Sequence, residues 1–185
     1  MARPLARGYD PTDSGLTTNW REGMMAGVLG AAVVAIFYLV FDVVVRGAAL
    51  LTPSILGQVL VLGQRNPDLT SINGTAILLY TVVHVVAFVV FGYLLTALAL
   101  RSEKSDLARY AVVQLLIVFE LFFYGLLAVA ASTTRGAFPF WSVLTANSLA
   151  AIAMGTWLWK RHPKVRAAIS RAPLGSAEED SRVTT

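Results

Sequence analysis

The chain has 185 residues, of which 56% are apolar and 14% are charged, whereas an ordinary soluble domain is nearer 45–50% apolar and about 25% charged. It contains no cysteine, which excludes disulfides, thiol chemistry and cysteine-held zinc or iron–sulfur centres. The net charge of +4 would suit nucleic acid, but the basic residues lie at the ends of apolar segments, as membrane topology requires. We therefore expect an integral membrane protein and no nucleic-acid partner.

The N-terminal part of the chain precedes the first apolar block. Residues 1–18 carry Pro, Gly, Asp and Arg without an apolar period, which predicts a flexible tail. Asn19 and Glu22 have the spacing of a capping box, so we expect the first helix to begin there. The apolar run that follows predicts a helix over about residues 23–45, since roughly 20 residues cross about 30 Å of hydrocarbon.

The connection over residues 46–75 contains a shorter apolar stretch. Pro53 stands at its start and Gly63 follows its end, which predicts a helix over about residues 53–62. A helix of about ten residues rises only about 15 Å, too little to span the membrane. This helix is therefore expected to lie in the interface or to enter the membrane and turn back.

Three further apolar blocks predict helices over about residues 75–100, 107–131 and 140–159. With the first helix they give the predicted fold, an all-α integral membrane protein with a four-helix transmembrane bundle over residues 19–160. The short interfacial or re-entrant helix lies between its first two members. Residues 161–185 are predicted to form a basic and then disordered cytoplasmic tail.

The Lys and Arg residues predict the orientation. If the N-terminus is cytoplasmic, only three of the 15 basic residues fall on the far side, as the positive-inside rule requires. We therefore predict a multi-pass protein of the cell membrane with both termini cytoplasmic and the lipid bilayer as its partner. The basic stretch over residues 160–171 is expected to anchor the chain against anionic headgroups, with a specific lipid or protein-docking site as the alternative. The three residues on the far side are Arg46, Arg65 and Arg135.

A few polar residues interrupt the apolar blocks. Glu120 falls near the bilayer middle, and His84 and Asn147 fall in the outer half, at a rise of about 1.5 Å per residue. A carboxylate at that depth costs roughly 2.5–3.5 kcal/mol, so intramembrane ionisable residues are candidates for function. We predict a ligand-binding or proton-binding cluster in which the Glu120 carboxyl meets the His84 ring. Its members are Asp42, Tyr80, His84, Glu120, Tyr124 and Asn147.

Two alternatives stand beside this cluster. The same polar side chains would also hold helices together by hydrogen bonds, without any further function. For Asp42, the alternative is a residue at the end of the first helix that is hydrated or paired with Arg46 at i,i+4 spacing.

Small residues recur every four positions on the first and last helices, a pattern that lets backbones approach closely. Packing within the chain explains them most simply, whereas a stripe that faces outward would contact a second copy or a partner in a membrane complex. They are Gly23, Gly27, Ala31 and Ala35 on the first helix, and Ala151 and Gly155, which follow Asn147, on the last.

No motif identifies a reaction, because the chain has no phosphate-binding loop, nucleophile elbow, HExxH pair or dinucleotide fingerprint. We predict no catalytic residue, metal or cofactor, and a metal or single-ligand tetrapyrrole at His84 is left as the alternative. The predicted function is small-ligand binding, or proton or solute handling, at the polar cluster. The alternatives are a non-catalytic accessory or structural subunit of a larger membrane complex, and a membrane enzyme with a metal or lipid substrate.

Overall fold

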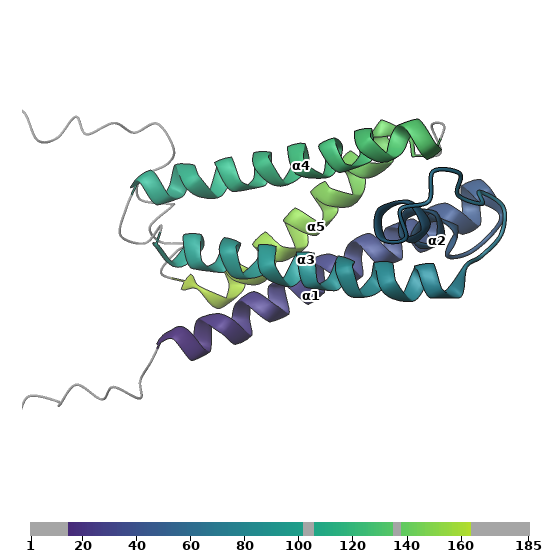
Figure 1. The fold of residues 1–185 in the computed structure, drawn as a ribbon. Helices are drawn as coiled ribbons and strands as arrows, with labels where there is room; N and C mark the ends of the chain where they lie inside the picture. The colour runs from purple at the N-terminus through teal and green to yellow at the C-terminus, as the bar shows by residue number, and fades with distance from the viewer. Residues whose placement is uncertain (1–14, 102–105, 135–137, 164–185) are drawn as a thin grey trace, which may run out of the picture.

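The computed structural model describes residues 15–101, 106–134 and 138–163, and the regular structure of these residues is entirely helical. The predicted all-α class is therefore confirmed. Four long helices run alternately in opposite directions along the molecule (Figure 1). They are α1 (Gly15–Phe41), α3 (Gly74–Arg101), α4 (Asp106–Thr134) and α5 (Phe140–Arg161).

The helices are longer than the apolar runs that predict them. α1 begins at Gly15, so Asn19 lies inside the helix and the capping box expected at its start is wrong. The reason is that each residue added to an existing helix gains a hydrogen bond, so a helix continues past its apolar stretch. At its other end, α1 passes into the π-helical turn η1 (Asp42–Arg46). Of the predicted tails, residues 1–14 and 164–185 lie outside the described residues.

The short helical segment lies between α1 and α3 in the chain, where the sequence predicts it. It consists of α2 (Leu51–Leu56) and the π-helical turn η2 (Gly57–Val61), and it sits at the end of the molecule far from the start of α1 (Figure 1). Left-handed backbone at Leu50 (φ 65°) and Gly63 (φ 65°) turns the chain on either side of the segment. Pro53 is its third residue rather than its first, which is tolerated because first-turn amides have no partner within the helix.

The main core joins the four long helices through aromatic rings and small residues. Phe88 of α3 and Met154 of α5 are fully buried, and the Phe91 ring of α3 lies 3.9 Å from the Phe119 ring of α4 between centroids. α1 and α3 cross in backbone contact, because a Cβ added at Gly27 would lie 2.5 Å from the Cα of Val89. Packing within the chain thus accounts for the α1 stripe at this point.

Two of the helical segments are long and apolar enough to cross a membrane: Trp20–Arg46, with a mean hydropathy of 2.6, and α3, with 2.3. Only 33% of the most apolar window of each is buried within the molecule, whereas a core helix of a soluble domain is mostly buried. α4 contributes a shorter apolar stretch, Gln114–Gly125. Along α3, large apolar side chains are exposed at every fourth position, namely Leu78, Val82, Val86 and Val90.

Candidate functional site

Two adjoining cavities lie between α1 and α3 beneath the α2–η2 segment. In the first, the space that the centres of water molecules can reach is about 40 Å³, and in the second it is about 110 Å³. They share Val34, Tyr38, Tyr80 and His84 as lining residues, and we call them together the His84 cavity. Since one water needs about 10–15 Å³ of such space, the cavity suits several waters or a very small solute, and it is too small for a quinone or a lipid.

His84 lies on α3 with its side chain buried. Its Nε2 is 3.2 Å from the carbonyl oxygen of Ala31 on α1. Because a carbonyl oxygen only accepts, Nε2 carries the proton of this hydrogen bond, and Nδ1 is the basic nitrogen of the neutral ring. No hydrogen bond to Nδ1 is present among the described residues. The ring therefore keeps one nitrogen available to accept a proton or bind a small ligand.

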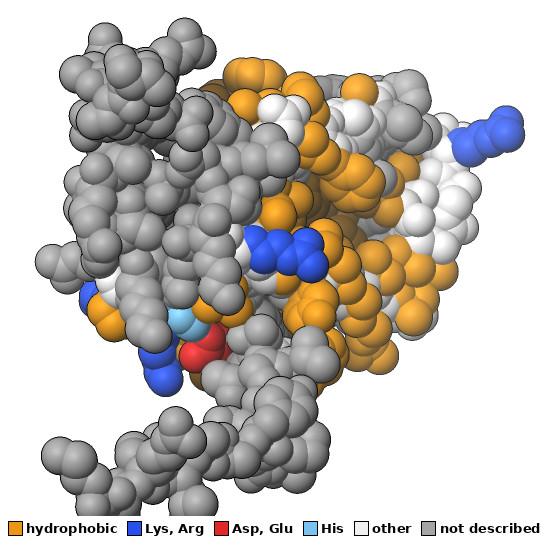
Figure 2. All heavy atoms as spheres, turned by 90° about the vertical axis from the view of Figure 1, so that its left-hand side faces the viewer, with side chains coloured by type: hydrophobic (Ala, Val, Ile, Leu, Met, Phe, Trp, Pro, Cys, Tyr) orange, Lys and Arg blue, Asp and Glu red, His pale blue; other side chains and the backbone are white. Residues whose placement is uncertain are grey.

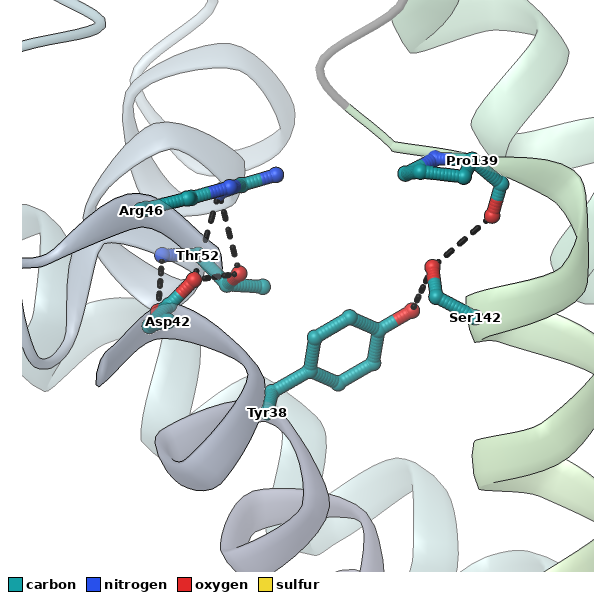
Figure 3. Close-up of polar contacts among 6 residues, drawn as sticks. All are labelled: Tyr38, Asp42, Arg46, Thr52, Pro139 and Ser142. Atoms are coloured by element: carbon teal, nitrogen blue, oxygen red, sulfur yellow. Dashed lines mark hydrogen bonds and ion pairs between the residues drawn. The ribbon is translucent and has the colours of Figure 1, made fainter. Parts of the chain in front are cut away.

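Two tyrosines complete the wall of the His84 cavity. The Tyr80 ring stacks on the His84 ring at 5.7 Å between centroids, one turn along α3. The Tyr38 hydroxyl of α1 lies 3.4 Å from the Ser142 hydroxyl of α5 (Figure 3). Since the Ser142 hydroxyl donates to the carbonyl oxygen of Pro139 at 2.8 Å, Tyr38 is the donor to Ser142. The hydrogen bond between Tyr38 and Ser142 joins α1 to α5, which are distant in sequence.

Glu120 approaches the cavity through Asn147 rather than through His84. The Asn147 side chain is 3% exposed and lines the cavity, and its Nδ2 donates to Oε2 of Glu120 at 3.2 Å. The predicted contact between the Glu120 carboxyl and the His84 ring is absent among the described residues, because each group has another partner. The level of a side chain in the bundle is set by its position along a helix, but the direction of the side chain also depends on how the helix is rotated about its axis.

Of the six predicted site residues, Tyr124 does not line the cavity, and Asp42 reaches it only through Thr52, which lines it. The Tyr124 hydroxyl donates to the carbonyl oxygen of Phe140 at 2.8 Å and is exposed, so it joins α4 to the start of α5. Asp42 belongs to a separate buried cluster at the end of α1. The other four residues line the cavity or hydrogen-bond to a residue that does.

The Asp42 cluster ties η1 to the first turn of α2. The Asp42 carboxylate is fully buried and accepts hydrogen bonds from the backbone N–H and the hydroxyl of Thr52, both at 2.6 Å (Figure 3). Arg46 lies 3.3 Å from the same carboxylate and donates to the Thr52 hydroxyl at 3.2 Å. The Arg46 guanidinium also sits over the rings of Phe41 and Phe138, at 5.3 and 5.0 Å. The alternative in which Asp42 pairs with Arg46 is confirmed.

Gln58 holds the loop that follows η2, a role that the sequence analysis missed. Its side chain is buried, its Oε1 accepts from the Asp68 N–H at 2.8 Å, and its Nε2 donates to the Asp68 carbonyl oxygen at 3.2 Å. The available signal was one polar residue within the apolar run over residues 55–62. The loop is thereby closed onto the segment that covers the His84 cavity.

Asp68 gives this loop a pH dependence. Its carboxylate accepts four hydrogen bonds from the hydroxyl and N–H groups of Ser71 and Thr70, at 2.6 to 3.0 Å. These bonds, the Ser71 hydroxyl foremost, hold the pKa of Asp68 well below its usual range. Because the folded pKa lies below the unfolded value of about 3.9, the contribution to stability is present above that pH and is lost as the pH falls through the folded value.

We therefore expect the Asp68 carboxyl signal in an NMR titration to have its midpoint well below about pH 3.9, the ordinary pKa of an Asp side chain. Replacing both Thr70 and Ser71 by Ala removes the two hydroxyl donors and should return the midpoint toward the ordinary value. A midpoint near the ordinary value in the unmodified chain would show that the four hydrogen bonds do not persist in solution.

Among the described residues, no three His, Asp or Glu side chains gather as metal ligands would. Comparison with protein-family models, with curated proteins and with solved structures finds no match to this chain. What the chain does must therefore be inferred from the chemistry of its own side chains.

Proposed function

We propose that the chain is a four-span membrane protein that moves protons, or a polar solute of comparable size to water, through the His84 cavity. The observation that carries this proposal is a cavity with room for several waters, lined by a buried His84 that keeps Nδ1 available. Tyr38, Tyr80 and Asn147 supply the other hydrogen-bonding groups of the wall. Buried ionisable groups in membrane helices commonly mark such pathways.

The placement of four helices across the membrane is part of the proposal. α4 has 29 residues and α5 has 22, so at about 1.5 Å per residue each exceeds the roughly 30 Å of hydrocarbon. α4 also exposes Leu121 and Phe122, and α5 exposes Ile152, each by more than half of the side chain. With the positive-inside orientation, α2 lies at the outer end, and the start of α1 and the end of α5 lie at the cytoplasmic side.

The hydrogen bond between His84 and Ala31 suits proton transfer. When Nδ1 accepts a proton, Nε2 still donates to the Ala31 carbonyl oxygen, so the ring keeps its position in both charge states. The partial negative charge on the carbonyl oxygen also favours the positive charge of the protonated ring. Asn147 donates to Glu120 and thereby retains its own Oδ1 as an acceptor for water or for the solute.

The test is proton flux into liposomes that contain the purified protein and a pH-sensitive dye, under an imposed pH gradient. We expect His84→Ala to lower the flux at least tenfold, because the nitrogen that accepts the proton is lost. Glu120→Gln should lower it less, since an amide still pairs with Asn147. Tyr124→Phe is the matched control, because Tyr124 lines neither part of the cavity and its hydroxyl bonds the Phe140 carbonyl oxygen, and its flux should equal that of the unmodified chain.

A rate no higher than that of protein-free liposomes would exclude proton movement, and the same assay with osmotic swelling would then test a neutral solute. Equal rates for His84→Ala and the unmodified chain would exclude the His84 cavity as the pathway. Circular dichroism of each variant confirms that the helices are retained.

A second candidate, an accessory subunit of a membrane complex, is favoured by one observation. Gly155 of α5 is exposed, and a Cβ added there would meet nothing within 4 Å among the described residues. The α5 stripe therefore packs against none of the described residues at this point. Copurification of a stoichiometric partner that is lost with Gly155→Leu, together with flux equal to that of protein-free liposomes, would favour this function.

A further inference from the structure

A third cavity lies at the other end of the molecule, where α1 begins and α5 ends. Its volume on the same measure is about 410 Å³, more than twice that of the two parts of the His84 cavity together. Figure 2 views this end and shows basic side chains beside a His and an acidic side chain, among hydrophobic ones. We call it the Arg21–Arg161 cavity. Its lining residues are Arg21, Glu22, Met25, Trp157 and Arg161.

The carboxylate in this cavity faces a histidine rather than either arginine. Oε2 of Glu22 lies 2.7 Å from Nε2 of His162, and both side chains are mostly covered. The two arginines have no carboxylate partner among the described residues. Arg161 places its guanidinium 4.7 Å over the Trp157 ring, which holds the group in place. With two guanidinium groups and one carboxylate, the lining of the cavity carries net positive charge.

Trp157 adds an unused donor. Its indole N–H is buried and has no hydrogen-bond acceptor among the described residues, and buried donors are ordinarily paired. The guanidinium and indole groups all donate and none accepts, so the complementary ligand is an anion with several acceptor oxygens. Met25 and the Trp157 ring supply apolar wall beside these donors, which suits a ligand with a polar head and an apolar body.

We propose that the Arg21–Arg161 cavity binds a phosphate group, and that the phosphate belongs to the headgroup of an anionic phospholipid. Phosphate matches the donors, because guanidinium groups bind its oxygens with charge-assisted hydrogen bonds. The lipid source rests on the membrane placement proposed above, which puts this end of α1 and α5 at the anionic cytoplasmic leaflet. The phosphate chemistry itself rests only on the cavity.

The test is native mass spectrometry of the full chain in detergent, with phosphatidylglycerol, phosphatidylcholine or inorganic phosphate added. The unmodified chain should retain one phosphatidylglycerol at least tenfold more than phosphatidylcholine. Arg21→Gln and Arg161→Gln should each lower this preference at least fivefold. Trp157→Phe, which keeps the ring under Arg161 but removes the N–H, should lower it about threefold. Arg65→Gln removes one exposed guanidinium at the other end and should leave the preference unchanged.

Equal retention of the two lipids, or equal behaviour of Arg21→Gln and Arg65→Gln, would overturn the proposal. Binding of inorganic phosphate without lipid, lost in Arg21→Gln, would retain the phosphate site and overturn the lipid source. His84→Ala should bind phosphatidylglycerol like the unmodified chain, because the two cavities share no lining residue. Failure of this site and failure of the proposed function are therefore distinguishable.

Discussion

Gly27→Ala is expected to lower the free energy of unfolding by about 1–3 kcal/mol, the range typical of overpacking a close contact. The added methyl would lie 2.5 Å from the Cα of Val89, and the neighbouring atoms are backbone, so the clash is relieved only if α1 and α3 move apart. The contact is reciprocal, because a Cβ at Gly92 would lie 2.5 Å from the N of Gly27. Denaturant titration in detergent micelles, followed by circular dichroism, measures the effect.

Gly155→Ala is the matched control for this prediction. None of the residues that the structure describes would contact the added methyl, and Ala has the higher helix propensity, so we expect no loss and a gain of up to about 0.5–1 kcal/mol. Equal effects of the two substitutions would show that α1 and α3 do not cross at Gly27. Ala31 accepts the hydrogen bond of His84 one turn beyond Gly27, so a separation of these helices should also reduce flux through the His84 cavity.

The helical segments could be predicted because local features determine them. Apolar runs of sufficient length indicate the long helices, and Pro53 and Gly63 mark the short one. The start of α1 could not be predicted in this way, because the residues from Gly15 onward carry no apolar period and join the helix by continuing its hydrogen bonds. In η1 and η2, the widened turns depend on the packing of neighbouring segments, which local sequence does not encode.

The levels of the site residues along their helices could be predicted from the sequence, but the directions in which their side chains point could not. Position along each helix puts His84, Glu120 and Asn147 near one level. Whether two of them touch depends on helix rotation, and the structure pairs Glu120 with Asn147 instead of His84. Contacts between distant segments leave even less local signal: nothing near Glu22 in the sequence indicates His162 as its partner. The Asp42–Arg46 pair, by contrast, could be predicted, because i,i+4 spacing places the two side chains on one face of a helix.

Asp42→Ala is expected to lower the free energy of unfolding by about 3–5 kcal/mol, the range found when one partner of a buried ion pair is removed. The carboxylate is fully buried and accepts from both the N–H and the hydroxyl of Thr52, so its loss leaves buried donors without their acceptor. Arg65→Ala, which removes an exposed charge from the same connection, should change stability by less than about 0.5 kcal/mol. A similarly small effect of Asp42→Ala would show that the carboxylate is hydrated rather than paired.

Two further measurements test whether the Asp42 carboxylate anchors α2 in particular or stabilises the whole chain. In a double-mutant cycle, Asp42→Ala with Arg46→Ala should destabilise the chain by less than the sum of the single changes, because each single change already removes the interaction between the two side chains. Hydrogen exchange at the Thr52 amide and through Leu51–Val61 should accelerate in Asp42→Ala more than exchange in α3.

Since Leu56 and Leu60 of this segment line the His84 cavity, a loosened segment should admit larger solutes while His84 is unchanged. The Asp42 cluster would then set the size limit of the pathway, and His84 its chemistry.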